Sequence, residues 1–238
     1  MNPLLRNSAA HVFVESLDAP TLTEPDEHHL ARVLRIRPTD VVSVTDGTGR
    51  WGEARLDAGA LHLVGPIHET LDAVAAPNFI LTIGCALPKG DRPEWIVQKL
   101  TELGLDRILL YETARSVVHW DGRKRQAQVE RLRRVAREAA MQSRRLTLPV
   151  VDVVTWGDAV AMPDVALAEP GGPLDWWGSD DAPSAPRVRS VLIGPEGGFA
   201  AEELAACGRR VGLGLTVLRV ETAAIAAGVL LTASSGRR

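Results

Sequence analysis

Short apolar segments alternate with helical patterns over the last two thirds of the chain, and this alternation constrains the fold more than any other feature. Segments with the length and composition of buried strands lie at 79–85, 107–111, 165–168, 191–194 and 216–219. Helical periodicity covers 92–103, 126–143, 200–211 and 223–233. Strands that alternate with helices in this way indicate an α/β domain with a mostly parallel sheet.

The N-terminal part has a different pattern, in which short β-type segments surround one short helix. The β-type segments lie at 11–15, 41–45, 51–56 and 60–64. The helix is expected over 27–34, where Leu30, Val33 and Leu34 share one face, and it ends before Pro38. A small barrel or sandwich fits this pattern.

The change of pattern near residue 72 separates two expected domains, which cover 1–72 and 73–238. Two domains are compatible with the length of 238 residues, since a domain takes ~150 residues on average. An Ala- and Pro-containing stretch at 71–77 reads as the linker between them. A second stretch, at 170–186, is rich in Gly, Pro, Ser and Asp, and we expect it to be a surface insertion.

The overall composition is that of a globular protein without a membrane span. The hydrophobic fraction of 45% and the charged fraction of 24% exclude a largely disordered chain. No apolar run approaches the ~18–20 residues of a membrane span, and the N-terminus lacks a signal pattern. Cys85 and Cys207 are too few for a disulfide framework or a Cys-rich zinc site. We expect a cytoplasmic protein with no metal and no membrane partner.

Positive charge is concentrated in the middle of a chain whose net charge is −3. Residues 73–150 carry 14 Lys and Arg against 8 Asp and Glu. Much of this charge falls on and beside the helix expected over 126–143, at Arg123, Lys124, Arg125, Arg131, Arg133, Arg134, Arg137, Arg144 and Arg145. The planar fork of arginine suits phosphate, so this segment is either an RNA-binding face or a solvated helix face.

Two short motifs have structural explanations that are simpler than the functional ones. Gly47, Gly49 and Gly52 match the spacing of a dinucleotide-binding fingerprint, but a strand rather than a helix is expected to follow, so a hairpin turn is the better interpretation. The adjacent pair His28 and His29 points in two directions on a helix and is expected to be solvated or to contact nucleic acid.

Two glycine-rich loops follow apolar segments near the C-terminus, at 191–199 and 213–223. Ligands bind at the carboxyl ends of strands in an open parallel sheet, so the two loops and the strand end at 167–168 can form one pocket. The first loop contains neither Lys nor Arg, so a neutral or cationic small molecule fits it better than a phosphate. The alternatives are a tight strand-to-helix turn and helix capping by Glu221 or Thr222. The candidate ligand contacts are Leu167, Ala168, Ile193, Gly194, Pro195, Gly197, Gly198, Leu213, Gly214, Leu218, Glu221 and Thr222.

The motifs together resemble the ribosomal RNA small subunit methyltransferase E family, of the SPOUT class of knotted methyltransferases. The resemblance extends in order over nearly the whole chain, at 28–35, 89–94, 98–104, 115–116, 138–143, 193–199 and 213–223. It implies an N-terminal barrel similar to PUA domains and a C-terminal α/β domain with a trefoil knot. It also implies S-adenosylmethionine as cofactor, N3 of a uridine in 16S ribosomal RNA of the small subunit as target, and a homodimer.

The implied reaction needs a group that takes or stabilises the N3 proton of uridine. Glu196 and Glu221 are the carboxylates near the two loops, and Arg115 or Arg219 can hold the anionic base or a phosphate. A capping role for Glu196 within its own loop is the structural alternative. The rival functions are a non-catalytic RNA-binding assembly factor and a nucleotide-cofactor enzyme, which would need a phosphate loop at 84–90.

We expect the homodimer to form through the helix at 223–233. Its apolar residues Ile225, Val229, Leu230 and Leu231 point in several directions, so the helix must be covered on most sides. Either a partner subunit covers part of it or its own domain buries it completely.

Overall fold

The computed structural model describes residues 2–69, 79–176 and 188–235. The expected linker at 71–77 lies outside these ranges, and so do residues 177–186 of the expected insertion. The chain forms two compact units, which we describe separately. The first unit contains Met1–Asn78 and Arg137–Leu148, and the second contains Phe79–Ala136 and Pro149–Arg238.

The first unit is built on a mainly antiparallel sheet with the strand order β1-β2-β3-β4, and β5 pairs with β3. The strands are β1 (His11–Phe13), β2 (Val41–Thr45), β3 (Arg50–Asp57), β4 (Ala60–Leu63) and β5 (His68–Glu69). Only β1 and β2 run parallel. The glycine-rich segment between β2 and β3 is a hairpin turn, as the sequence predicted.

The helix expected over 27–34 is present in a different form. After α1 (Pro3–Asn7), α2 covers Glu24–His28 and continues as the π-helix η1 (His29–Val33). A face shared by positions i, i+3 and i+4 requires α-helical spacing, which the wider π turn does not provide. Leu30 is therefore fully buried, whereas Val33 is 58% exposed and Leu34 is 45% exposed.

Residues 137–148 belong to the first unit, and they form hydrogen bonds with several of its residues. Arg137 donates from Nη1 to Asp26 Oδ1 (2.8 Å), and from Nη2 to Asp26 Oδ2 (2.6 Å) and the Phe13 carbonyl (3.1 Å). Burial raises the pKa of Asp26, but hydrogen bonds from Arg137 and Thr23 outweigh it and hold that pKa below its ordinary value.

A second group of polar contacts joins the same segment to β1 and β2. Arg144 donates to the hydroxyl (2.6 Å) and carbonyl (2.5 Å) of Ser8. The ring of His11 bonds to the Ser43 hydroxyl through Nδ1 and to the Arg145 carbonyl through Nε2, both at 2.8 Å. Burial lowers the pKa of His11 from 6.5 to about 4, so this ring is neutral at physiological pH.

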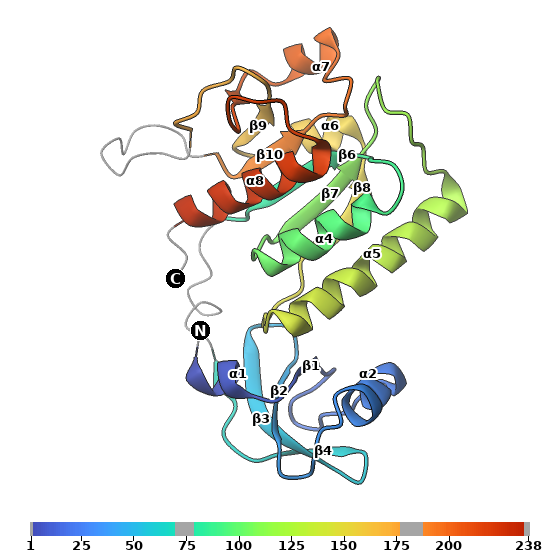
Figure 1. Ribbon diagram of the computed structural model, residues 1–238, viewed down its shortest axis with the longest axis vertical. Helices are drawn as coiled ribbons and strands as arrows, with labels where there is room; N and C mark the ends of the chain where they lie inside the picture. The colour runs from blue at the N-terminus through green and yellow to red at the C-terminus, as the bar shows by residue number, and fades with distance from the viewer. Residues whose placement is uncertain (1, 70–78, 177–187, 236–238) are drawn as a thin grey trace. The chain divides into compact units, whose positions relative to one another are not determined.

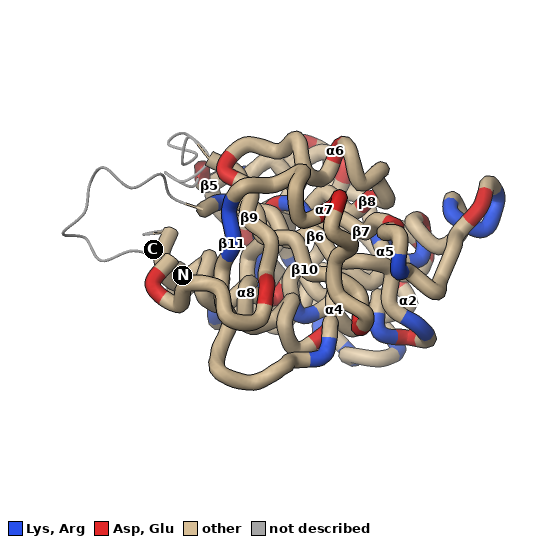
Figure 2. The backbone as a smooth tube through the Cα atoms, turned by 90° about the horizontal axis from the view of Figure 1, so that it is seen from above, with Lys and Arg blue, Asp and Glu red and all other residues tan. Residues whose placement is uncertain are grey.

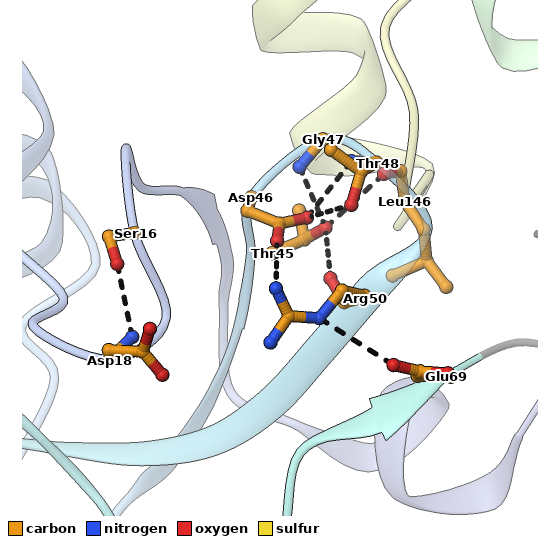
Figure 3. A network of polar contacts seen from close by, with 9 residues as sticks. All are labelled: Ser16, Asp18, Thr45, Asp46, Gly47, Thr48, Arg50, Glu69 and Leu146. Atoms are coloured by element: carbon orange, nitrogen blue, oxygen red, sulfur yellow. Dashed lines mark hydrogen bonds and ion pairs between the residues drawn. The ribbon is translucent and has the colours of Figure 1, made fainter.

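The β2–β3 hairpin is attached to the segment as well (Figure 3). The Leu146 carbonyl accepts hydrogen bonds from the Thr45 hydroxyl (3.2 Å) and the Gly49 amide (3.3 Å). Thr48 forms an antiparallel bridge with Thr147. The role of this glycine-rich turn is therefore structural.

The second unit is an α/β domain with a six-stranded parallel sheet, which confirms the main prediction from the sequence. The strand order is β11-β9-β10-β6-β7-β8, and every neighbouring pair is parallel. The strands are β6 (Thr82–Ala86), β7 (Arg107–Tyr111), β8 (Val150–Val154), β9 (Val165–Ala168), β10 (Ser190–Ile193) and β11 (Arg210–Val211).

Helices cover both faces of this sheet (Figure 1). The helices are α4 (Arg92–Glu102), α5 (Gly122–Gln142), α6 (Trp156–Val160), α7 (Ala201–Ala206) and α8 (Val220–Ser234). On one face, α4 packs against α8, which lies over β6 and β10, and Ile83 and Cys85 of β6 belong to that core. On the other face, Ala86 packs in a cluster with residues of α6 and α7.

Two of the predicted elements of this unit are wrong. The segment at 216–219 is a loop, because nothing in the described chain covers Val217, which is 84% exposed. The helix expected over 200–211 ends at Ala206, since Cys207 is extended (φ −130°, ψ 119°), and the chain continues into β11. The strand β8 was not predicted.

Candidate functional site

The strand order brings three strand ends together, of which β9 and β10 were predicted and β11 was not. β9 lies between β11 and β10, so the loops that follow these three strands leave the sheet side by side. Between them is a cavity of about 130 Å³. It is lined by Ala168, Glu169, Pro170, Ile193, Gly194, Pro195, Glu196, Gly198, Leu213, Gly214, Thr216, Val217, Leu218, Val220 and Ala223.

The loop after β10 depends on glycine at two positions. At Gly194, an added Cβ would lie only 3.1 Å from the ring of Phe199, so a side chain there would displace the ring or fill the cavity. Gly198 has a φ of +70°, which L residues rarely adopt, and its amide closes a turn on the Pro195 carbonyl (2.8 Å). The buried Tyr111 hydroxyl fixes the strand end by donating to the Ile193 carbonyl (2.9 Å).

The second loop, between β11 and α8, forms the opposite wall. Gly214 has a φ of +151°. The carbonyl of Gly212 accepts a hydrogen bond from Trp176 Nε1 (2.8 Å), so Trp176 of the expected insertion packs locally against this loop. Leu215, at the outer edge of the loop, is 95% exposed.

The charged residues that line the cavity within the described part of the chain are both acidic, Glu169 and Glu196. Burial raises the pKa of Glu169, and the nearby charge of Arg210 opposes this increase. An apolar cavity with glycine backbone and two acids favours a neutral or cationic ligand over a phosphate, as the sequence predicted.

The two candidate carboxylates contact one arginine. Arg92, the first residue of α4, donates from Nη1 to Glu196 Oε1 (2.8 Å), and its Nε lies 3.8 Å from Glu221 Oε1. Glu221 is the only charged residue of α8. Figure 2 colours the acidic and basic positions along the backbone. The sequence left open that Glu196 caps its own loop. The structure shows instead that its side chain accepts a hydrogen bond from Arg92 of α4.

Arg115 lies on the loop after β7 and is attached to the first glycine loop by donating from Nη1 to the Gly197 carbonyl (2.7 Å). The backbone beside it is anchored by the buried Glu203, whose carboxylate accepts from the Ala114 amide (2.8 Å) and the Ala200 amide (2.7 Å). Arg115 is exposed, and its guanidinium is therefore held close to the cavity loops while remaining accessible.

Most of the predicted ligand contacts line the cavity, and four do not. Leu167 is fully buried in the core on the opposite face from α8. Gly197 contributes its carbonyl to Arg115, and Glu221 contacts Arg92. Thr222 is exposed on α8, and Arg219 is the N-cap residue of that helix.

Sequence reasoning missed six residues of the lining. They are Glu169, Pro170, Thr216, Val217, Val220 and Ala223. Their positions directly after β9 and within the second loop were the available signal, since residues that follow parallel strands face the same edge of the sheet.

Several of the basic side chains in and beside α5 form ion pairs or hydrogen bonds within the protein. Arg131 pairs with Glu94 (2.9 Å), Arg133 bonds to the Val151 carbonyl (3.0 Å), and Arg125 donates to a backbone carbonyl. The exposed cations of α5 that make no ion pair or hydrogen bond with the described residues are Arg123, Lys124 and Arg134. These three are the candidates for contact with an anionic partner.

Within the described ranges, no helix has both the length and the hydropathy of a membrane span. In the same residues, no group of three or more His, Cys, Asp or Glu side chains is arranged to hold a metal ion.

Comparisons with known proteins identify the family. A family model described as an RNA methyltransferase domain matches residues 76–232, and an RNA methyltransferase PUA domain matches residues 22–64. The ribosomal RNA small subunit methyltransferase E of Bacillus subtilis is 34% identical over 225 residues, which cover 87% of each chain. The Mycobacterium bovis enzyme of the same name is 32% identical and covers 88% of this chain and 84% of its own. The chain belongs to the ribosomal RNA small subunit methyltransferase E family.

Solved structures agree on the fold. The small subunit methyltransferase E of Neisseria gonorrhoeae, bound to S-adenosylmethionine, superposes with a TM-score of 0.73 at 23% identity and covers 92% of this chain and 94% of its own. A Legionella pneumophila methyltransferase with the same cofactor has a TM-score of 0.75 at 24% identity and covers 94% and 96% of the two chains. A PUA domain followed by a parallel α/β domain is thus the architecture of this family member.

Proposed function

We propose that the protein transfers a methyl group from S-adenosylmethionine to N3 of a uridine in 16S ribosomal RNA of the small subunit, in the cytoplasm. The observation that carries this proposal is the acidic, glycine-walled cavity at three adjacent strand ends, in a chain that belongs to a ribosomal RNA methyltransferase family. Methylation at N3 is what the resemblance of the motifs implies, and nucleoside analysis of the methylated RNA tests it.

The residues of the cavity fit S-adenosylmethionine. Its adenosine carries no phosphate, which agrees with two loops whose lining residues include no Lys or Arg within the described chain. Apolar side chains such as Leu213 and Leu218 are suited to the adenine, while the backbone at Gly194 and Gly214 permits close approach. Glu169 and Glu196 supply the negative charge that a sulfonium and an ammonium group require.

When bound, S-adenosylmethionine supplies an electrophilic methyl group on a positively charged sulfur. Orientation of the uridine toward that methyl group provides a large part of the catalysis. Glu196 is the candidate group for the N3 proton because it lines the cavity, and Glu221, the other carboxylate that the sequence singled out, lies 3.8 Å from the arginine that contacts Glu196. Arg115 is placed to hold the anionic base or a neighbouring phosphate, since it is exposed and anchored to Gly197.

We further propose that the domain of residues 1–72 binds RNA and the domain of 73–238 carries out methyl transfer. Exposed cations on both parts support this assignment. In the first unit, Arg32, Arg35 and Arg37 are exposed around the end of η1. In the second unit, Arg123 and Lys124 are exposed on α5. Each phosphate neutralised by such residues contributes to affinity through counterion release.

We also propose that the working unit is a homodimer and that the methyltransferase domain contains the trefoil knot of the SPOUT class. For the dimer, α8 offers an apolar surface that its own unit leaves partly uncovered, with Val229 45% exposed. Leu215 and Val217 are almost fully exposed on the preceding loop. Ala227 and Gly228 are buried, and a Cβ on Gly228 would lie 2.8 Å from Leu100 of α4, so this side faces its own unit.

Two measurements test the function. Calorimetric titration with S-adenosylmethionine is expected to show one site per chain, and the absence of binding would refute the proposal. Purified small subunits are then incubated with a labelled methyl donor, and the RNA is digested to nucleosides for mass spectrometry against 3-methyluridine and 5-methyluridine standards. Label in any nucleoside other than 3-methyluridine would leave the methyltransferase but remove the N3 assignment.

A further inference from the structure

Arg92 connects the two carboxylates near the cavity, although it belongs to neither glycine loop. It is the first residue of α4, whereas Glu196 follows β10 and Glu221 lies in the first turn of α8. Its Nη1 lies 2.8 Å from Glu196 Oε1 and its Nε lies 3.8 Å from Glu221 Oε1. A guanidinium can contact two carboxylates through different nitrogen atoms because its donors form a rigid fork.

The two carboxylates differ in access. The Glu221 side chain is 15% exposed, and its Oε2 is buried with no hydrogen-bond partner among the described residues. The Glu196 side chain is 55% exposed and lines the cavity. Glu196 Oε1 accepts from Arg92, and its Oε2 makes no hydrogen bond with the described part of the chain. A substrate at the cavity can therefore reach Glu196 and not Glu221.

We propose that Arg92 is a positioning residue: anchored on Glu221, it holds Glu196 at the cavity with Oε2 free to accept the N3 proton of the substrate. This inference rests on the proposed uridine N3 reaction. An ion pair as exposed as the one between Arg92 and Glu196 contributes little to stability, so its role is orientation of the carboxylate.

The step balances in atoms and charge. The N3–H bond breaks and the proton passes to Glu196 Oε2, while N3 forms a bond to the methyl carbon. The carbon–sulfur bond of the donor breaks, and its electron pair remains on sulfur as a neutral thioether. With both acids ionised, the Arg92–Glu196–Glu221 group has a net charge of −1. Proton transfer to Glu196 brings this charge to zero, while the sulfonium loses its +1 charge in the same step. The site as a whole therefore does not change charge.

Substitution of Arg92 tests the proposal through the separation of kcat from KM. In Arg92→Ala, kcat is expected to fall about 10- to 100-fold, which is part of the effect of a general base. The KM for RNA and the calorimetric Kd for S-adenosylmethionine are expected to stay within about threefold of wild type, because Arg92 does not line the cavity. Arg92→Lys should recover part of kcat, since an ammonium group restores the charge without the fork.

A matched control is available on the same helix. Lys99 pairs with Glu102 of α4 (2.8 Å) at a similar exposure of 35%, and it is about 10 Å further along the axis. Lys99→Ala is expected to leave kcat and both binding constants unchanged. Circular dichroism and thermal melting confirm that each variant is folded.

The combination of Arg92→Ala with Glu196→Gln decides whether the two residues act together. If Arg92 acts through Glu196, the double variant has the kcat of Glu196→Gln alone. Multiplicative losses in kcat would overturn the proposal. An increased KM for RNA with unchanged kcat in Arg92→Ala would also overturn it, because Arg92 would then be a phosphate contact.

The proposed function is tested independently of this inference. Nucleoside analysis of RNA methylated by the wild-type enzyme establishes the target atom without any variant. A different methylated nucleoside refutes the N3 assignment, whereas 3-methyluridine with unchanged kcat in Arg92→Ala refutes only the role of Arg92.

Discussion

Arg137→Ala is expected to destabilise the first unit substantially, although the residue lies in a run of basic residues that resembles a solvated face. The substitution leaves the Asp26 carboxylate, whose side chain is 6% exposed, without its bidentate partner. It also removes a donor to the Phe13 carbonyl. Breaking a buried ion pair from one side costs about 3–5 kcal/mol. We expect about 3 kcal/mol, at the lower end of that range, because Arg137 itself is 28% exposed.

This cost corresponds to a decrease in Tm of roughly 6–12 °C for a chain of this length. The assay is thermal melting followed by circular dichroism, with Arg134→Ala as the control, since Arg134 is exposed and makes no contact that the structure describes. The control should melt within about 1–2 °C of wild type, as surface substitutions usually do. Equal Tm values for the two variants would refute the structural role of Arg137.

The same ion pair predicts a dependence on pH. Burial raises the pKa of Asp26, but the hydrogen bonds that Arg137 and Thr23 donate to its carboxylate lower it by more. The pKa is therefore lower in the folded state than in the unfolded chain. Its contribution to the free energy of unfolding is therefore complete above the ordinary carboxylate range and decreases as the pH falls through the lowered folded pKa. Arg137→Ala should show a weaker loss of stability in acid than wild type, and parallel profiles would contradict this assignment.

Three further predictions concern the site, the RNA and the assembly. Gly194→Val should weaken S-adenosylmethionine binding about tenfold or more in calorimetry, because the side chain meets Phe199 and the cavity. Gly197→Val should retain that affinity, since a Cβ there meets only Arg115 at 3.5 Å, and equal losses would contradict the cavity assignment. The triple alanine variant at Arg123, Lys124 and Arg134 should weaken RNA binding and reduce the slope of log K against log salt by up to about 2, and an unchanged slope would remove α5 from the RNA contact. Wild type should have a mass near twice 25.6 kDa in light scattering, and Val229→Glu should reduce it to one chain, whereas a dimeric Val229→Glu would exclude this surface.

The sequence predicted the elements whose signals are local. The parallel sheet and the two glycine loops were evident because apolar strands and φ-permissive residues leave a pattern within a few positions, as at Ile193 and Gly194. The prediction of a strand at 216–219 was wrong because it also rested on a local signal. The β-type composition of this segment is local, but a strand also needs a neighbour, and Val217 has none in the described chain.

Contacts between distant segments were outside the reach of local patterns. Arg92 and Glu196 are 104 residues apart, and Arg137 and Asp26 are 111 apart. A run of basic residues on a helix has the same appearance whether each arginine meets water, RNA or a buried acid. The partners of Arg137 and Arg144 therefore became evident only when the fold placed residues 8–13 beside residues 137–148.

The division of the first unit into two stretches of chain also sets the order in which it can form during synthesis. Its N-terminal stretch ends at Asn78, but Arg137, Arg144 and Leu146 are added only when translation reaches Leu148. At ~5–20 residues per second, the nascent N-terminal stretch waits roughly 4–14 s for them. During that time Asp26 lacks its partner and Ser8 lacks Arg144, so the nascent first unit holds polar groups that are not yet paired. A fragment that stops at residue 78 should behave as this nascent state does, and supplying residues 137–148 as a separate peptide should increase its helical and β-sheet content.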